Sequence, residues 1–199
     1  RYVGKIKNRL AHLEHIVNDM LLYARSNSIG VEEKFQMTQL LTELELFLDS
    51  QLLNTNIEFD WQDKTEDVSV SANKQMLLSA LSNLCVNAIQ AMQGNGKIQV
   101  TARKTGDSNI EILVCDNGPG INDEKLKNIF DPFFTTRNEG TGLGLAVVRA
   151  IINAHKGQVL VDSQEGVGTT FIVTIPLINA ISSNFIQDQA ENIRMVGMS

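Results

Sequence analysis

Two carboxamides, one carboxylate and several glycines are the residues of this sequence whose types and spacing suit chemistry. Asn83 and Asn87 lie four positions apart in an apolar stretch, so a helix would place both amides on one face. An amide oxygen is a hard, neutral ligand that suits Mg²⁺. Asp116 lies between an alternating apolar stretch and the nearby glycines Gly118 and Gly120. Its carboxylate can accept a hydrogen bond from an exocyclic amine, and the glycines let the backbone approach a flat ring.

Two more groups of glycines occur later in the chain. Gly140, Gly142 and Gly144 open a helical pattern, and backbone N–H groups at the start of a helix form an anion site. Their spacing differs from that of the dinucleotide-binding fingerprint, and the Gly-Lys-Ser/Thr ending of a Walker loop is missing. Gly166 and Gly168 precede the last strand-like segment.

Each of these segments also has a purely structural explanation. The two asparagines can be core amides with satisfied hydrogen bonds, since an unpaired buried amide costs about 1–3 kcal/mol. The dipeptide Asn117-Gly118 can be an ordinary turn, residues 140–144 can cap a helix, and residues 166–168 can be the turn before a strand. One at a time, the segments do not decide between a ligand site and these alternatives.

The hydrophobic periodicity first predicts one long helix. Apolar residues within 1–26 recur in steps of three and four, which is the seam of a bundle or coiled coil. Such a helix cannot bury its seam alone, so it requires a partner. The chain begins at Arg1 inside this pattern, which predicts that it is a piece of a longer protein.

Helices and strands then follow one another irregularly. Helices are predicted after an N-cap at Thr38, over 74–92 after an N-cap at Asn73, and over 143–155. Period-two alternation predicts strands, which are 57–61, 68–70, 97–104, 110–115, 158–163 and 170–175. Because the order lacks a strict βαβ rhythm, we expect an α+β fold, a two-layer α/β sandwich with a mixed sheet packed on helices. We expect this domain to span 31–176, after a bundle helix at 1–30 and before a tail at 177–199 of unknown role.

The composition excludes several classes of protein. The 199 residues carry a formal net charge of −6 without basic runs, which argues against nucleic acid or an anionic membrane as the main partner. No apolar run reaches the length of about 18 residues that a membrane span requires. Cys85 and Cys115 belong to no C-x-x-C pair, so they are interpreted as buried small hydrophobic residues in a reducing cytosol.

In their order along the chain, the segments resemble the sequence boxes of the catalytic domain of histidine kinases. The matching segments are the N box (81–88), the G1 box (116–121), the F box (130–136), the G2 box (140–145) and the G3 box (166–171). The resemblance covers residues 36–176 and implies the Bergerat fold, which DNA gyrase and related ATPases share. The F and G2 boxes most resemble the nitrogen-regulation branch, whose kinases typically partner activators of sigma-54 transcription. Residues 1–30 resemble the second helix of the dimerisation and histidine-phosphotransfer domain.

The resemblance implies a site for ATP and Mg²⁺. Asp116, helped by Thr169, would hold the adenine amine. Asn87 would ligate the metal, and Asn83 would support the phosphates. A lid would close over the triphosphate, anchored by burial of its phenylalanines. Other residues that the resemblance assigns to the nucleotide are Gln90, Gly118, Gly120, Ile121, Phe130, Phe134, Thr135, Thr136, Arg137, Gly140, Thr141, Gly142, Leu143, Gly144 and Leu145.

The catalytic residues that the resemblance implies are Asn83, Asn87 and Arg137. Arg137 would touch the γ-phosphate. Many relatives carry Lys or Arg where this chain has Gln90, so more of the charge neutralisation falls on Arg137. Hydrolytic relatives such as gyrase keep a Glu at the position of Asn83, and an amide cannot act as a base. The resemblance therefore implies transfer of the phosphoryl group to a nucleophile other than water.

The attacking histidine is expected upstream of Arg1. The family's phosphoacceptor is followed by an acidic residue and then by Pro, and neither His12 nor His15 matches this pattern. His155 ends the predicted 143–155 helix, where a cation suits the helix dipole. This chain should then bind nucleotide without phosphorylating itself.

The resemblance also implies partners. They are a response regulator of the sigma-54 activator type and a second copy of the protein, which would form a homodimer through the dimerisation helices. No direct contact with nucleic acid and no membrane span are expected in this chain. The expected location is the cytoplasm, and membrane tethering of the full-length protein stays open. Two alternatives remain, a Ser/Thr kinase of the anti-sigma type and a nucleotide-binding interaction module.

Overall fold

The computed structural model describes residues 21, 31–66, 68–137 and 140–177. Its elements are β1 (Glu33–Gln36), α2 (Met37–Leu52), β2 (Asn56–Lys64), β3 (Ser69–Ala72), α3 (Lys74–Met92), β4 (Asn95–Thr105), β5 (Asn109–Asp116), α4 (Asp123–Leu126), α5 (Gly144–Ala154), β6 (Gln158–Gln164) and β7 (Gly168–Pro176). Apart from Leu21 and Leu177, the helix expected at 1–30 and the tail expected at 177–199 lie outside the described residues. None of the described helices is both long and apolar enough to cross a membrane.

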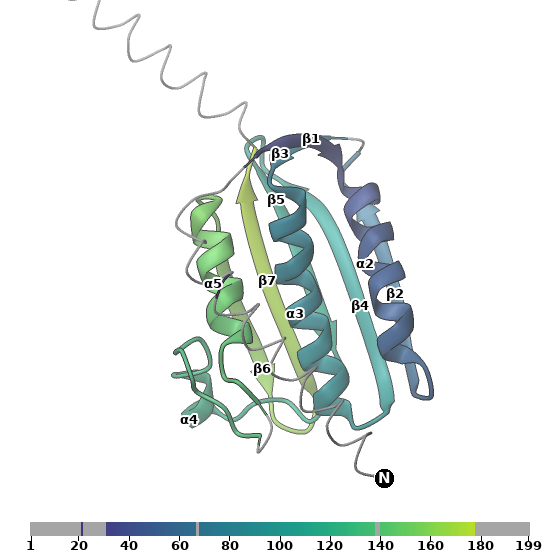
Figure 1. Cartoon of the computed structure of the whole chain (residues 1–199), viewed down its shortest axis with the longest axis vertical. Helices are drawn as coiled ribbons and strands as arrows, with labels where there is room; N and C mark the ends of the chain where they lie inside the picture. The colour runs from purple at the N-terminus through teal and green to yellow at the C-terminus, as the bar shows by residue number, and fades with distance from the viewer. Residues whose placement is uncertain (1–20, 22–30, 67, 138–139, 178–199) are drawn as a thin grey trace, which may run out of the picture.

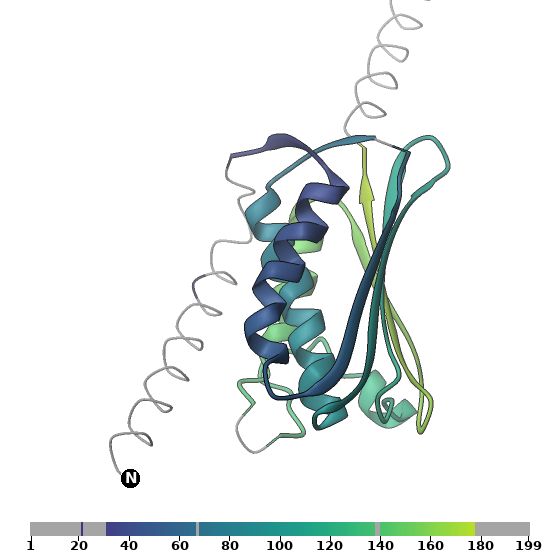
Figure 2. The ribbon, with the colours of Figure 1, turned by 90° about the vertical axis from the view of Figure 1, so that its right-hand side faces the viewer.

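Five strands form a mixed sheet in the order β2-β4-β5-β7-β6. Strand β2 runs parallel to β4, and all other neighbours are antiparallel. Helices α2, α3 and α5 lie side by side on one face of this sheet (Figure 1). The view from the side shows one layer of helices and one layer of strands (Figure 2). The expected α+β sandwich with a mixed sheet is therefore confirmed.

The hydrophobic core lies between the three long helices and the inner face of the sheet. Every second residue of a strand points to the same face, and in β4, β5 and β7 these inner residues are buried. The helices supply apolar residues three and four apart, which form the matching stripe. Large side chains with almost no exposed surface are Leu41, Leu44, Leu48, Leu77, Leu81, Leu84, Ile98, Ile112 and Ile151.

Helix α3 is the central helix of this layer, and its predicted start is confirmed. The Asn73 side chain accepts a hydrogen bond from the Met76 amide at 3.0 Å, which satisfies one open donor of the first turn. The helix ends at Gln93, whose φ of 55° is left-handed. Between these ends, the helix places the carboxamides expected to do chemistry in its C-terminal half.

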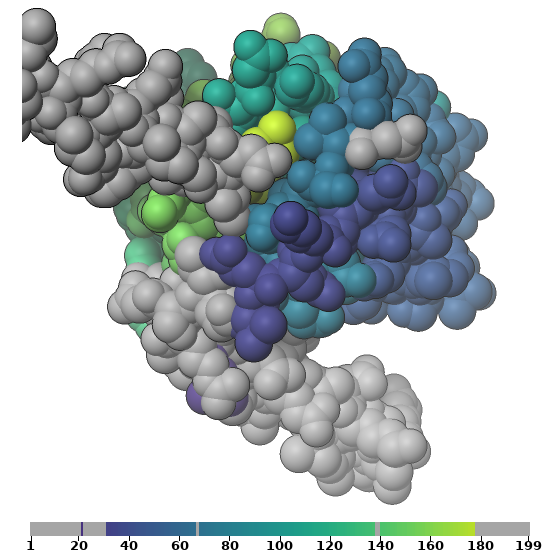
Figure 3. All heavy atoms as spheres, turned by 90° about the horizontal axis from the view of Figure 1, so that it is seen from above, coloured from purple at the N-terminus to yellow at the C-terminus, as the bar shows by residue number. Residues whose placement is uncertain are grey.

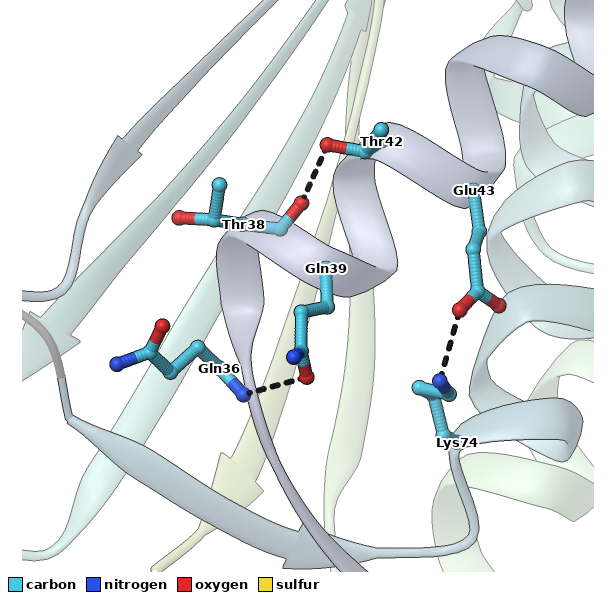
Figure 4. A network of polar contacts seen from close by, with 6 residues as sticks. All are labelled: Gln36, Thr38, Gln39, Thr42, Glu43 and Lys74. Carbon is cyan, nitrogen blue, oxygen red and sulfur yellow. Dashed lines mark hydrogen bonds and ion pairs between the residues drawn. The ribbon is translucent and has the colours of Figure 1, made fainter.

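Helix α2 begins earlier than predicted, because Gln36 and not Thr38 is its N-cap. The Gln36 amide donates to the Gln39 side-chain oxygen at 3.3 Å, and the Thr38 hydroxyl points elsewhere (Figure 4). An ion pair of 2.7 Å between Lys74 and Glu43 ties α2 to the start of α3.

Two short elements were not predicted from the sequence. Strand β1 pairs antiparallel with β3 in a separate two-stranded sheet. Seen from that end, the purple residues of β1 lie against blue residues of the β3 region (Figure 3). Helix α4 is a single turn between β5 and α5. Both elements have four residues, which is too short for a periodic pattern.

His155 joins the end of α5 to the start of α3. Its Nδ1 lies 2.8 Å from the Ile151 carbonyl oxygen, and its Nε2 accepts a hydrogen bond from the Asn73 amide at 3.1 Å. Because Nε2 accepts, the ring is neutral and carries its proton on Nδ1. The side chain is also buried, and its neutral ring differs from the cation expected at this helix end.

Asp63 connects α2 to β2. One carboxylate oxygen accepts from the Thr38 hydroxyl at 2.6 Å, and the other accepts from the amide and the hydroxyl of Thr65 at 2.9 and 2.7 Å. Partial burial raises the pKa of Asp63, but these hydrogen bonds outweigh it and hold the pKa below its ordinary value of 3.8.

We expect Asp63→Asn to lower the free energy of unfolding at pH 7 by about 1 kcal/mol. A lowered pKa contributes stability above the unfolded value of 3.8, and this contribution is lost as the pH falls through the folded value. The difference between parent and variant should therefore shrink below pH 3.8 in urea unfolding curves. Asp60→Asn, an exposed position on the same strand, is the matched control. A difference that is constant with pH would contradict this role of Asp63.

Candidate functional site

Three polar side chains form a row across one end of the sheet. Asp116 at the end of β5 pairs in register with Thr169 of β7, and Thr169 pairs with Ser163 of β6. All three side chains lie on the helix-facing side, in line with the buried Ile98 of β4. A row of polar groups on an otherwise apolar inner face is costly unless it serves a ligand or is fully hydrogen-bonded.

Asp116 is a partly desolvated carboxylate. Burial raises its pKa, and hydrogen bonds from the backbone of Gly118 and Thr169 offset part of this effect. The Gly118 amide donates to one carboxylate oxygen at 2.8 Å. The carboxylate therefore has capacity left to accept a hydrogen bond from a ligand.

The loop after Asp116 is held tightly against the turn between β6 and β7. Gly120 has a φ of +71°, and a side chain there would collide with the Gln164 carbonyl oxygen. The Gly166 amide donates to the Pro119 carbonyl oxygen at 2.7 Å. Next along the loop, the Ile121 amide donates to the Ser163 hydroxyl at 2.9 Å. The G1 and G3 boxes therefore pack directly against each other.

Helix α3 lies over this row of polar residues. Burial and the nearby charge of Asp116 raise the pKa of the Cys85 thiol to about 12. Cys85 lies between Asn83 and Asn87 along the chain, so the carboxylate is close to the segment that carries both amides. Asp116 and helix α3, far apart in the sequence, therefore meet at Cys85.

Asn83 presents an unsatisfied donor. Its Nδ2 atom is buried, and no hydrogen-bond partner for it exists among the described residues. Leaving such a donor unpaired costs about 1–3 kcal/mol, so an acceptor on a ligand would stabilise the site. This observation favours the ligand-site interpretation of the N box over a pair of satisfied core amides.

Asn87 faces the start of α5. A β-carbon on Gly144 would lie 3.8 Å from the Asn87 Nδ2 atom. The N-cap residue of α5 is Leu143, whose apolar side chain makes no capping hydrogen bond, and backbone N–H groups of a first turn such as this one suit an anion. Leu143 and Leu145 serve this helix start as hydrophobic anchors, one buried and one half-buried. Thr141 accepts a hydrogen bond from the Leu143 amide at 3.1 Å.

The F and G2 boxes pack against each other. The Phe133 amide donates to the Gly142 carbonyl oxygen at 2.9 Å. Gly142 has a φ of +67°, and a side chain there would collide with the Phe133 backbone. The Phe130 ring meets Phe171 edge-on at 6.3 Å, whereas the Phe133 side chain is 66% exposed. The expectation that all three phenylalanines of the F box anchor the lid by burial is therefore wrong for Phe133.

Arg137 lies against helix α3. Its guanidinium donates to the Asn87 carbonyl oxygen at 3.0 Å and to the side-chain oxygen of Gln90. Burial lowers its pKa, yet an arginine stays charged at neutral pH. Among the described residues it forms no ion pair with a carboxylate. A cation with its charge uncompensated lies beside Asn87, which suits an anionic ligand.

The remaining expected residues take lesser places. The Thr135 hydroxyl accepts from the Arg137 amide at 3.1 Å, and a side chain on Gly140 would collide with that hydroxyl. Thr136 is exposed, and Ile121 and Phe134 are half-buried against the core. Ser163 was not expected. Its signal in the sequence is a polar residue at an inner position of an alternating strand.

The described residues contain no group of three or more His, Cys, Asp or Glu that could hold a metal ion by themselves. Mg²⁺ is commonly held by one or two protein oxygens together with substrate phosphates and water. One amide oxygen beside an anion site fits this pattern. Asn87 therefore suits a metal that arrives with its ligand.

Comparison with known sequences identifies related proteins. The profile of the family described as "Histidine kinase-, DNA gyrase B-, and HSP90-like ATPase" matches residues 72–179. Sporulation kinase E of Bacillus subtilis (strain 168) is 34% identical over 88% of this chain. The signal transduction histidine-protein kinase AtoS of Escherichia coli (strain K12) is 31% identical over 88% of it. The chain spans 24% and 29% of the lengths of these two relatives.

Solved structures of histidine kinases are similar in fold. The catalytic domain of histidine kinase ThkA has a TM-score of 0.67 at 34% identity, over 74% of this chain and 96% of that one. ThkA in complex with the response regulator protein TrrA has a TM-score of 0.71 at 32% identity, over 88% and 50% of the two chains. Full-length ShkA in complex with AMPPNP has a TM-score of 0.77 at 26% identity, over 88% and 38%.

We expect Asp116→Asn to weaken the binding of adenine nucleotides at least about tenfold without loss of the fold, because a hydrogen bond to a charged acceptor is lost. A raised pKa contributes stability below the unfolded value of 3.8, and this is lost as the pH rises through the folded value. At pH 7 the neutral variant should therefore melt no lower than the parent. Calorimetric titration and thermal unfolding measure the two effects.

The parent should also lose nucleotide affinity on acidification at a higher pH than an ordinary carboxyl would allow, since burial raises the pKa of Asp116. Asp162→Asn, an exposed position of β6, is the control. Unchanged affinity in Asp116→Asn would remove Asp116 from the adenine role.

Proposed function

The chain belongs to the histidine kinase-, DNA gyrase B- and HSP90-like ATPases, and from this premise we propose that it is the ATP-binding catalytic part of a two-component sensor histidine kinase. The observation that supports the proposal most is the buried, unpaired Nδ2 of Asn83. It lies on the same helix as Asn87, which faces the open N-terminus of α5. Unpaired donors of this kind need a ligand with many acceptor oxygens, and a triphosphate supplies them.

The proposed binding mode follows the chemistry of each group. Asp116 accepts a hydrogen bond from the adenine amine, with Thr169 beside it. The Asn83 amide nitrogen and the first-turn amides of α5 donate to phosphate oxygens. Arg137 offers its charge to the γ-phosphate, held at α3 by Gln90. Asn87 would ligate Mg²⁺ through its amide oxygen, and the bound metal would neutralise charge on the phosphates.

The proposed reaction is phosphoryl transfer to histidine. A neutral imidazole nitrogen of the acceptor attacks the γ-phosphorus, an N–P bond forms, and the bond to the bridging oxygen breaks as ADP leaves. Asn83 stands where hydrolytic relatives keep a base, and its amide cannot deprotonate water. Retention of the phosphoryl group for the protein acceptor is consistent with this substitution.

The proposal extends to partners and location. A response regulator would receive the phosphoryl group, as the complex of the similar kinase ThkA with TrrA suggests. Its assignment as a sigma-54 activator, homodimerisation through the helix at 1–30, and a cytoplasmic location are part of the same proposal. The acceptor histidine is proposed to lie on the preceding helix of the dimerisation domain.

A transfer experiment tests the proposed function. We expect the chain, given labelled ATP and Mg²⁺, to phosphorylate a separately supplied acceptor-helix domain of a related histidine kinase. The product should be acid-labile and base-stable, as phosphohistidine is. Asn87→Ala should reduce the transfer at least about tenfold through lost metal binding, and Asn153→Ala, exposed on α5, should not. An acid-stable product would indicate a Ser/Thr kinase, and nucleotide binding without transfer would indicate an interaction module; either result contradicts the proposal.

A second prediction concerns the charge at the γ-phosphate. We expect Arg137→Gln to weaken ATP binding about tenfold and ADP binding less than about twofold, because only ATP carries the phosphate that this charge meets. Calorimetric titration with both nucleotides measures the difference. Arg103→Gln on the outer face of the sheet, where Arg103 pairs with Glu111, is the control. Equal losses for ATP and ADP would contradict the assignment.

A further inference from the structure

A hydroxyl outside the expected motifs, that of Ser163 on the edge strand β6, lies beside Thr169 at the end of the sheet proposed to bind the base. We infer that Ser163 is a specificity-determining positioning residue, which holds the Thr169 hydroxyl so that its oxygen accepts, and so selects a purine with a 6-amino group over one with a 6-oxo group. The inference rests on the proposed function, in which Asp116 and Thr169 hold the base.

The hydrogen bonds around Ser163 favour one arrangement of protons. Its hydroxyl oxygen lies 2.9 Å from the Ile121 amide, 3.0 Å from the Gly168 carbonyl oxygen and 2.9 Å from the Thr169 hydroxyl. The amide can only donate, and the carbonyl oxygen can only accept. The Ser163 hydroxyl therefore donates its single proton to the Gly168 carbonyl oxygen and accepts a hydrogen bond from the Ile121 amide. The third contact is a hydrogen bond only if Thr169 is its donor.

The orientation of the Thr169 hydroxyl follows directly. Its proton points to Ser163, so only lone pairs are left for any other partner. Thr169 is 6% exposed, which leaves little room for solvent to offer a competing acceptor. Its backbone, in turn, donates to the neighbouring Asp116 carboxylate. The two side chains that meet the base are thus both acceptors.

Two acceptors distinguish the substituent at position 6 of a purine. An amino group carries two protons and can satisfy both oxygens, directly or through water. A carbonyl oxygen at the same position has no proton to give and leaves the buried acceptors unpaired. Polar groups left unpaired in this way are the usual source of strong discrimination between ligands of similar shape.

The surroundings keep Ser163 from turning away. It lies in β6, whose register with β7 places it beside Thr169. The loop after Asp116 is tied to the same place by the Ile121 amide and by the bond from Gly166 to Pro119. Rotation of the whole Ser163 side chain out of this position would break three hydrogen bonds at once, so the contacts support one another.

Matched nucleotides test this inference. Calorimetry with ATP and with inosine triphosphate, which differs from ATP by a 6-oxo group in place of the 6-amino group, gives a ratio of dissociation constants. In Ser163→Ala, Thr169 is free to donate to the 6-oxo group, so we expect the preference for ATP to fall about five- to tenfold. Ser163→Thr, which restores a hydroxyl, should keep the parent ratio. Should Ser163→Ala not fold, Ser163→Cys keeps the volume and weakens the hydrogen bonds.

Further variants separate positioning from a general loss of structure. Ser163→Ala combined with Thr169→Val should show the same ratio as Thr169→Val alone, because Ser163 acts through Thr169. Thr170→Val removes a hydroxyl from the opposite face of β7 and should leave the ratio unchanged. A purely structural role would weaken both nucleotides equally and leave the ratio as it was, which would overturn the inference.

The nucleotide affinities of the parent distinguish a failure of the role of Ser163 from a failure of the proposed kinase function. Equal affinity of the parent for ATP and inosine triphosphate would overturn the role of Ser163 while the proposed kinase function stands. Absence of binding to either nucleotide would overturn both.

Discussion

The partly buried carboxylate of Asp116 is the feature on which the rest of the site depends. Burial at the end of β5 makes ionisation of this group unfavourable, and backbone amides return only part of the loss. A fold keeps such a group when a ligand donor replaces the water. The neighbouring elements are arranged around it: β7 brings a hydroxyl beside the carboxylate, and the buried Cys85 of α3 lies near it.

The end of the site proposed to bind the phosphates is built from groups with the opposite requirement. The amide nitrogen of Asn83, the first turn of α5 and the guanidinium of Arg137 all present donors or positive charge. The site therefore has two poles, acceptors at the sheet end and donors at the helix ends. This polarity matches a molecule with an amine at one end and anionic oxygens at the other, and it would orient such a molecule in one direction only.

Much of this arrangement could be predicted from the sequence. The Asn73 cap, the extent of α3 and the central strands follow from local chemistry and periodicity, and the boxes of polar residues identify the ends that meet. Elements of four residues, such as β1 and α4, could not be predicted because periodicity has no meaning over one turn or two pairs. The start of α2 was missed because the Thr38 hydroxyl bonds to Asp63, a residue 25 positions away.

Two contacts of the site could not be predicted from the sequence, because the residues that form each contact are far apart along the chain. The contact between Arg137 and Gln90 spans 47 positions, and the one between Ile121 and Ser163 spans 42. Neither residue type indicates its partner. The sequence indicates only that Gln90 stands where many relatives carry a positive charge. The fold shows that the Arg137 guanidinium lies against Gln90.

The buried imidazole of His155 has a mechanical consequence. It connects the end of α5 to the start of α3, at the end of both helices that lies away from Gly144 and Asn87. The two antiparallel helices therefore resemble tongs with their pivot at this ring. A tilt of one helix against the other about this ring would give its largest displacement at the opposite ends, where Gly144 faces Asn87 and where a triphosphate is proposed to bind.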